Sequence, residues 1–321
     1  MLSRQADIEA ASQISFAHQP VMVREVLEYL NLEKGKVIVD GTIGAGGHAK
    51  AILEAIKPGG RLIGIDRDPK AIAQARRNLI NMAEAVSYYC ENYRNLQSIL
   101  EQEGLKEIDG LLLDLGVSSI QLEDPERGFS FRLDGPLDMR MGNDAKRTAA
   151  KILNEESEKE IARILLKYGE ERWARRIAHF IIEARERRPI KTTGELVRII
   201  EDAVPVGARR GHKHPARKTF QALRIAVNDE LEDLKEGMHL GVTSLARSGR
   251  IVILTYQSLE DRIVKSTLNS LAERTYGPPG YPLSRKEMVR ILTKKPVKPS
   301  LEEIRVNPRA RSAKLRAAER I

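Results

Sequence analysis

Short apolar runs alternate with helical patterns over the first part of the chain. Runs typical of strands begin at positions 37, 61, 85 and 108, and between them the apolar residues recur at helical spacing. The run at 108–115, IDGLLLDL, is apolar at successive positions, as in strands that are buried on both faces of a parallel sheet. This alternation predicts an α/β fold with a doubly wound, mostly parallel sheet.

The alternation stops after the fourth strand. Residues 116–143 are rich in Gly, Ser, Asp and Pro, and a loop of that length is uncommon in a compact domain unless it has a function. Helical patterns follow over 148–202, and the next strand pattern is RIVILTY at 250–256. We therefore expect an inserted helical domain and divide the chain into a first part of the sheet domain, a substrate-recognition insert and a second part of the sheet domain, at 1–119, 120–215 and 216–321.

Further expectations concern the second half and the two ends. Apolar spacing predicts one long amphipathic helix over 219–245, and a last strand near 289–292. From residue 294 onward the chain contains nine basic and three acidic residues and is expected to be partly extended. Such a basic segment either contacts a nucleic-acid backbone or has no binding role. The first 17 residues are expected to be a loose leader.

The glycines after the first strand point to a ligand. The strand ends at Asp40 and continues into GTIGAGGH, after which a helix begins. A strand, a glycine-rich turn and a helix open nucleotide-type α/β domains, because a ligand can lie against backbone that carries no Cβ. The second strand ends at Asp66, about 20 residues after the glycines, where an acid can accept both hydroxyls of a ribose. Together the two signals predict an adenosine-containing ligand.

The turn departs from the GxGxxG pattern of dinucleotide-binding proteins. Counted from Gly44 and Gly46, the third glycine position holds Ala49. In addition, Asp40 at the strand end would repel a pyrophosphate and attract a cation. S-adenosylmethionine has no phosphate and carries a sulfonium and an α-amino group. The departure therefore favours S-adenosylmethionine over NAD.

Polar residues at strand ends are the candidates for ligand contacts, since ligands of open parallel sheets lie outside the carboxyl ends of the strands. Tyr93 follows the third strand and can flank an adenine, while Asp114 and Gln121 can hydrogen-bond ligand polar groups. The alternative is that Asp40 and Asp66 only cap the turns that follow them. Methyl transfer requires in-line placement of nucleophile, methyl group and leaving sulfur, and it requires no metal.

Charge and cysteine content narrow the class of protein. The net charge of +9 suits a polyanionic partner, or a basic enzyme without one. His212 and His214 lie among Arg and Lys, which disfavours a metal and favours phosphate contact. The single cysteine, Cys90, excludes an internal disulfide and fits a reducing, cytoplasmic compartment. No apolar run approaches the ~20 residues of a membrane helix, so no membrane partner is expected. The oligomeric state stays open, with a homodimer as one alternative.

Several longer stretches resemble one known family. They are HQPVMVREV, DGTIGAGGH, IDRDP, DGPLDMRM, KTFQALRIAVNDEL, SLEDRIVK and NPRARSAKLRAAER. On these motifs the chain resembles the bacterial 16S ribosomal RNA cytosine-N4 methyltransferases. The resemblance implies a class I, Rossmann-like methyltransferase fold and S-adenosylmethionine as methyl donor. It implies as substrate the exocyclic amine of a cytidine near the decoding site of the small ribosomal subunit. Carried over by motif, the donor-binding residues are Gly46, Gly47, His48, Asp66, Tyr93, Asp114 and Gln121.

The chemistry of this substrate suggests roles for further residues. The amine of cytosine is a poor nucleophile because its lone pair is delocalised into the ring. Asp114 is therefore the candidate catalytic residue, as a hydrogen-bond acceptor that turns the lone pair towards the methyl group. The DGPLDMRM loop is expected to close over the base. The expected substrate contacts are Ser118, Asp138, Arg140 and Lys218.

The chain departs from the family pattern in two places. The family usually has Phe-His before SLEDR, whereas this chain has Tyr256 and Gln257, and glutamine cannot act as a titrating base. This leaves open an RNA-binding ribosome-assembly factor that binds donor without turnover. A DNA amino methyltransferase is a second alternative. It is disfavoured because DLGVSS at 114–119 replaces the Asp/Asn-Pro-Pro-aromatic motif of many such enzymes.

Overall fold

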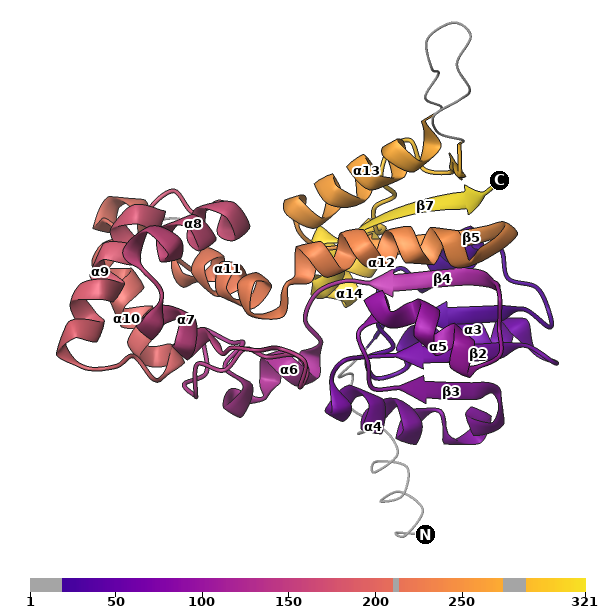
Figure 1. Ribbon diagram of the computed structural model, residues 1–321, viewed down its shortest axis with the longest axis horizontal. Helices are drawn as coiled ribbons and strands as arrows, with labels where there is room; N and C mark the ends of the chain where they lie inside the picture. Colours follow the sequence, from indigo (N-terminus) through magenta and orange to yellow (C-terminus); the bar gives the residue numbers. More distant parts are fainter. Residues whose placement is uncertain (1–18, 210–213, 274–286) are drawn as a thin grey trace, which may run out of the picture.

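The computed structural model describes residues 19–209, 214–273 and 287–321. The centre of this part of the chain is a seven-stranded sheet in the order β3-β2-β1-β4-β5-β7-β6 (Figure 1). Strands β1 to β5 are parallel, and β7 runs antiparallel to both of its neighbours, so the predicted doubly wound, mostly parallel sheet is confirmed. The strands are β1 (Val37–Asp40), β2 (Arg61–Ile65), β3 (Val86–Tyr89), β4 (Ile108–Asp114), β5 (Leu245–Thr255), β6 (Val289–Ile291) and β7 (Lys314–Arg320).

Side chains of the central strands alternate between two cores, one on each face of the sheet. In β4, Leu111 and Leu113 belong to one core and Leu112 to the other, and all three are buried. Because helices cover both faces, the strands are apolar at successive positions, which accounts for the sequence pattern. One face is covered by α2 (Val23–Leu30), α3 (Gly47–Ile56) and α4 (Pro69–Asn78), and the other by α5 (Leu96–Gln102), α12 (Glu230–Ser244) and α13 (Ser258–Ala272).

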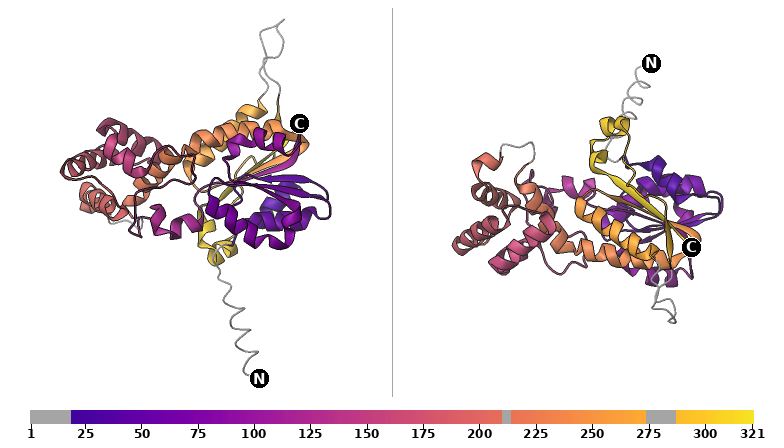
Figure 2. Two further views of the ribbon diagram at one scale, coloured as in Figure 1. Left: turned by 60° about the horizontal axis from the view of Figure 1, so that its bottom comes forward. Right: turned by 90° about the horizontal axis from the view of Figure 1, so that it is seen from above.

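A helical lobe lies beside the carboxyl ends of the parallel strands (Figures 1 and 2). The chain leaves the sheet after β4, passes through the short helix α6 (Ser119–Glu123), and returns only at α12. The lobe has a hydrophobic core of its own, which includes Ile161, Ile177 and Phe220. Its helices are α7 (Ala149–Glu155), α8 (Glu158–Gly169), α9 (Ala174–Arg187), α10 (Thr193–Ala203) and α11 (Ala216–Asn228). The three-part division remains our proposal, and the packing of α11 in the lobe favours moving its second boundary from 215 to the turn at Asp229.

The prediction of one long helix over 219–245 is wrong, because two helices occupy this segment. Helix α11 ends and α12 begins on either side of Asp229, whose left-handed backbone (φ 51°) cannot continue a helix. The apolar stripe runs on across the break, so spacing alone cannot detect it. The turn brings Glu230 back against Arg224, whose guanidinium donates two hydrogen bonds of 2.8 Å to the Glu230 carboxylate.

The carboxyl-terminal segment is built into the sheet. The expected strand near 289–292 is present as β6, but residues 314–320 form β7, which is inserted between β5 and β6. Leu315 and Ala317 are buried, while Lys314 and Arg316 form ion pairs with Asp261 of α13. This end is extended at β7, but Lys314 and Arg316 are paired within the fold and are not free to contact a nucleic-acid backbone. Ahead of β7 lies α14 (Leu301–Val306).

Two further predictions concern residues at the margins of the described chain. The expected leader at 1–17 lies outside the described residues, and so do residues 210–213, including His212, of the basic loop expected at 206–218. The end of that loop is helical instead, because Lys218 belongs to α11. Among the described residues, no helix is long and apolar enough to cross a membrane.

Candidate functional site

A cavity of about 480 Å³ opens at the carboxyl ends of the parallel strands. Four strand ends line one side of it through Gly44, Asp66, Tyr93 and Asp114. The opposite side comes from α11, α12 and the start of α13. The cavity therefore lies between the sheet and the helical lobe, and it gathers the residues that the sequence places after separate strands.

The glycine turn after β1 is shaped by two residues with left-handed backbone. Gly44 has φ 53° and Gly46 has φ 86°, conformations that favour glycine. A Cβ on Gly46 would lie 3.1 Å from Leu79, and one on Gly47 would lie 3.1 Å from Pro20. Gly47 lines the cavity, whereas Gly46 allows the turn to pack on α4 and does not reach the cavity.

Asp66 joins the glycine turn to the end of β2. Its Oδ2 accepts a hydrogen bond of 3.0 Å from the backbone N–H of Gly44, and its Oδ1 accepts one of 2.9 Å from Asp68. Burial raises the pKa of Asp66 to about 6, against the effect of these two donors. The side chain is therefore mostly ionised at neutral pH and offers its remaining lone pairs to a ligand hydroxyl.

Asp40 has a different place from the one that the sequence suggests. It is buried under the glycine turn, where its Oδ1 accepts a 3.2 Å hydrogen bond from Thr42, and it does not line the cavity. Burial raises its pKa to about 8, so the carboxyl is mostly protonated at neutral pH. The prediction that Asp40 repels a pyrophosphate is therefore wrong, and the charge of the cavity must come from other acidic residues.

The ring of Tyr93 lies in the cavity wall against α12. A Cβ on Gly237 of α12 would come within 2.4 Å of the Cδ2 and Cε2 atoms of this ring. Glycine at 237 thus provides the space that the ring occupies. This contact spans two segments that are far apart in the chain, and sequence reasoning missed Gly237.

Gln121 lines the cavity, but much of its side chain is used in the fold. Its Nε2 donates a 2.9 Å hydrogen bond to Asp68, and its Oε1 accepts one of 3.0 Å from the backbone N–H of Ser118. Ser118 in turn caps α6 by accepting a hydrogen bond from the Gln121 backbone. The pair fixes α6 to the turn after β2, and both residues face the cavity.

Asp114 stands at the centre of a polar group at the end of β4. Its Oδ1 accepts a 2.8 Å hydrogen bond from the hydroxyl of Tyr256, and its Oδ2 lies 3.7 Å from Nδ1 of His48. The other ring nitrogen of His48, Nε2, is 2.8 Å from the carbonyl of Val21 and must donate to it. Burial raises the pKa of Asp114, while His48 and Tyr256 act in the opposite direction.

The far wall of the cavity holds charged residues that sequence reasoning missed. Arg224 of α11 is buried and forms an ion pair with Glu230 at the start of α12. Its Nη2 also lies 3.9 Å from Oε1 of Glu260 in α13. The Oε2 of Glu260 accepts hydrogen bonds from the backbone N–H groups of Tyr256 (2.9 Å) and Gln257 (3.1 Å). Burial raises the pKa of Glu260 to about 7. The sequence could have pointed to this charged wall, because Arg224 interrupts the apolar stripe of α11.

Three of the expected substrate residues lie away from the cavity. Arg140 and Asp138 hydrogen-bond each other at 2.9 and 2.7 Å, and neither lines the cavity. Lys218 donates a 2.6 Å hydrogen bond to the carbonyl of Glu170 within the lobe. Ser118 alone among the four reaches the cavity wall.

Comparison with known proteins identifies the chain. Residues 15–321 match the model of the MraW methylase family. The chain belongs to this family. It is 50% identical to a protein of Heliobacterium modesticaldum named "Ribosomal RNA small subunit methyltransferase H", over 95% of this chain and 99% of that protein. A protein of Geobacter sulfurreducens with the same name is also 50% identical, over 96% of this chain and 100% of that one. Among solved structures, an rRNA methylase from Streptococcus thermophilus is similar over 93% of both chains, with 10% identity and a TM-score of 0.42.

The cavity of this methylase is acidic. Three arginines, Arg67, Arg224 and Arg309, line it, and each is paired with a carboxylate. Such a lining attracts a cationic ligand and disfavours a pyrophosphate. Among the residues that the structure describes, no cluster of His, Cys, Asp and Glu could hold a metal ion. The acidic side chains of the lining are Asp66, Glu91, Asp114, Glu230, Asp233 and Glu260.

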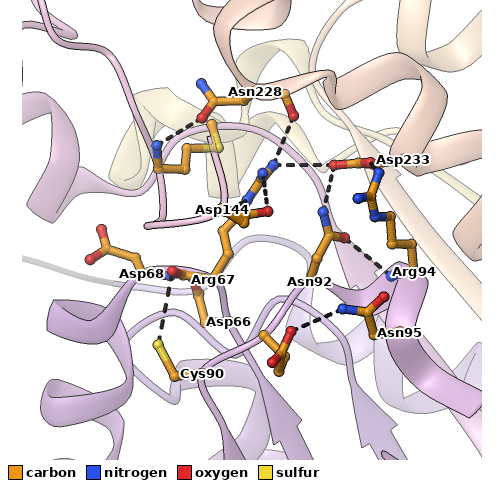
Figure 3. A network of polar contacts seen from close by, with 12 residues as sticks. Asp66, Arg67, Asp68, Cys90, Asn92, Arg94, Asn95, Asp144, Asn228 and Asp233 are labelled. Atoms are coloured by element: carbon orange, nitrogen blue, oxygen red, sulfur yellow. Dashed lines mark hydrogen bonds and ion pairs between the residues drawn. The ribbon is translucent and has the colours of Figure 1, made fainter. Parts of the chain in front are cut away.

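A polar network joins the lobe of the methylase to its sheet at the cavity edge (Figure 3). Arg67, directly after β2, donates to Asp144 of the lobe segment, to Asp233 of α12 and to the carbonyl of Asn228. Asn92 adds a 2.6 Å hydrogen bond to Asp233. Because Arg67 contacts all three segments, it holds the two sides of the cavity at a fixed separation.

Proposed function

We propose that this methylase transfers the methyl group of S-adenosylmethionine to the exocyclic N4 amine of a cytidine in 16S ribosomal RNA near the decoding site. The names of its relatives support ribosomal RNA of the small subunit as the substrate class. The observation that carries the proposal is the place of Asp114. A half-buried hydrogen-bond acceptor, Asp114 at the end of β4, lies in the same cavity as Asp66, the acid placed for ribose hydroxyls.

The residues of the strand ends fit the donor. S-adenosylmethionine supplies an electrophilic methyl group on a sulfonium, and the acidic lining favours that positive charge. Asp66 would bind the ribose hydroxyls and Tyr93 would contact the adenine. The remaining donor residues in the proposal are Gly46, Gly47, His48, Asp114 and Gln121, of which Gly46 acts by shaping the turn.

Asp114 acts on the acceptor side of the reaction. An N–H of the cytosine amine donates to its carboxylate, which turns the nitrogen lone pair out of conjugation and towards the methyl group. In the proposed step the N–C bond would form as the bond between the methyl group and the sulfonium sulfur breaks, a neutral thioether would leave, and the nitrogen would give up a proton to Asp114 or to water. The catalytic contribution is therefore placement of the lone pair and acceptance of a proton, with Ser118 as a neighbouring substrate contact.

The position of the cavity suits a nucleotide that has left its stack. A base enters between lobe and sheet only after it is extruded, which costs least in irregular or single-stranded RNA. We therefore propose the assembled small ribosomal subunit as partner and the cytoplasm as the site of action. The structure does not place Asp138, Arg140 or Lys218 in the cavity wall. In this proposal they would contact RNA outside the cavity.

The test is transfer of tritium from labelled S-adenosylmethionine to small ribosomal subunits that lack this modification. Naked 16S RNA and DNA are assayed in parallel, and nuclease digestion identifies the labelled nucleoside. We expect label in N4-methylcytidine from the subunit, and its loss in Asp114→Ala. Label in DNA alone would replace the proposal with a DNA amino methyltransferase. Donor binding without any transfer would replace it with the assembly factor.

A further inference from the structure

We propose that Tyr256 is a positioning residue for this methyl transfer: its hydroxyl holds one carboxylate oxygen of Asp114 and leaves the other oxygen for the amine of the substrate base. This inference rests on the proposed function and adds to it a residue to which the sequence analysis assigned no role.

Asp114 is fixed at both its backbone and its side chain. Its backbone N–H donates a 2.6 Å hydrogen bond to Oγ1 of Thr42 in the glycine turn. Its Oδ1 accepts the 2.8 Å hydrogen bond from the Tyr256 hydroxyl. A carboxylate held at one oxygen cannot rotate freely about its side-chain bond, so the direction of the second oxygen is set as well.

The second oxygen of Asp114 is free to accept a ligand proton. Nδ1 of His48 lies 3.7 Å from this oxygen, which is beyond hydrogen-bonding distance. Among the described residues, no donor lies within hydrogen-bonding distance of Oδ2. The arrangement leaves one open acceptor in the cavity.

Tyr256 itself is held by the wall that links sheet and lobe. Its backbone N–H donates a 2.9 Å hydrogen bond to Glu260, and the Oε1 atom of Glu260 lies 3.9 Å from Arg224 of the lobe. The Tyr256 backbone is thereby tied to α13, and α13 lies against the last lobe helix, α11. Sheet and lobe both contribute to the position of Tyr256.

The hydroxyl also sets the charge state of Asp114. Burial raises the pKa of this carboxyl, and the hydrogen bond from Tyr256 lowers it. The charged and titratable groups that face the pair are His48 from α3 and Asp40 from β1 on the Asp114 side, and Glu260 from α13 and Glu303 from α14 on the Tyr256 side. Removal of the hydroxyl therefore moves the protonation of Asp114 to higher pH.

The experiment compares Tyr256→Phe with Tyr89→Phe. The control removes a hydroxyl that donates a 2.7 Å hydrogen bond to Glu103, and neither residue lines the cavity. We measure kcat for subunit methylation from pH 5.5 to 9, the donor Kd and the melting temperature. For Tyr256→Phe we expect kcat to fall about 10- to 100-fold, as for loss of a hydrogen bond to a charged group. We also expect the acid limb of the profile to move to higher pH.

The outcomes separate this inference from the proposed function. Absence of label with the wild-type protein overturns both. Label with the wild type and an unchanged kcat and pH profile for Tyr256→Phe overturns the inference alone. A loss of kcat without a shift of the acid limb shows a merely structural role and also overturns it. If the phenylalanine variant fails to fold, 3-fluorotyrosine at position 256 replaces it. Its more acidic hydroxyl is a stronger donor and should move the acid limb to lower pH, and no movement would refute the inference.

Discussion

The contact between Gly237 and Tyr93 allows a sharp test of the donor site. Alanine at 237 places a Cβ 2.4 Å from two atoms of the Tyr93 ring, a separation that real Cβ atoms essentially never show. The ring must move, and its free side is the cavity. In the proposed donor site this movement displaces the surface on which the adenine rests.

The size of the effect follows from two opposing contributions to stability. Overpacking of this kind costs about 1–3 kcal/mol, and alanine in place of a helix glycine returns about 1 kcal/mol. The net loss of unfolding free energy is then about 0–2 kcal/mol. Contact of a base with an aromatic ring contributes about 1–3 kcal/mol. Its loss would weaken donor binding by about 5- to 150-fold.

The same helix provides the matched control. A Cβ on Gly241, one turn later in α12, would lie 2.3 Å from Cδ2 of Leu111, which is buried in the core and does not line the cavity. Both variants are expected to lower the melting temperature by a similar amount. Only Gly237→Ala is expected to weaken binding of S-adenosylmethionine in calorimetry. Equal donor affinities for the two variants would refute the placement of Tyr93 against the donor.

Three further predictions follow from the site. Since the pKa of Asp66 is raised to about 6, its ionised fraction and with it donor affinity should fall about tenfold between pH 7 and pH 5, whereas Asp66→Asn should bind weakly with a flat pH profile. Arg67→Ala should lower the free energy of unfolding in urea by about 2–3 kcal/mol, because Asp233 loses one of its two arginine partners and keeps only Arg94. Arg67→Lys should restore part of this loss. Arg140→Ala should leave donor affinity unchanged but raise KM for subunits. An altered donor affinity would contradict its place outside the cavity.

Some of the proposed donor site was predictable because its determinants are local. Asp66 and the glycine turn each lie directly after an apolar run, and the carboxyl ends of parallel strands meet at one edge of a sheet. The prediction that polar strand ends share one site needs only the strand assignments. The structure places His48, Tyr93 and Asp114 in that one cavity.

Other parts of the site depend on residues that are distant in sequence. The Tyr256 hydroxyl meets Asp114 across 142 positions, and no pattern near either residue predicts the contact. The charge of Asp40 was misjudged for a related reason. Its pKa is raised by burial beneath the turn, and burial of a strand-end acid is decided by the elements that cover it.

The sequence by itself determined the doubly wound sheet, the glycine turn and the residues after each strand, because hydrophobic period and turn chemistry act over a few residues. The tertiary structure alone decided the break at Asp229, the pairing of β7 and the charged far wall of the cavity. In each case the local signal was ambiguous. The apolar stripe runs through the break, and β7 carries Arg and Lys whose charges are neutralised only when Asp261 of α13 packs beside them. The break at Asp229 and the pairing of β7 are stabilised by residues that are distant in sequence and come close only in the folded chain.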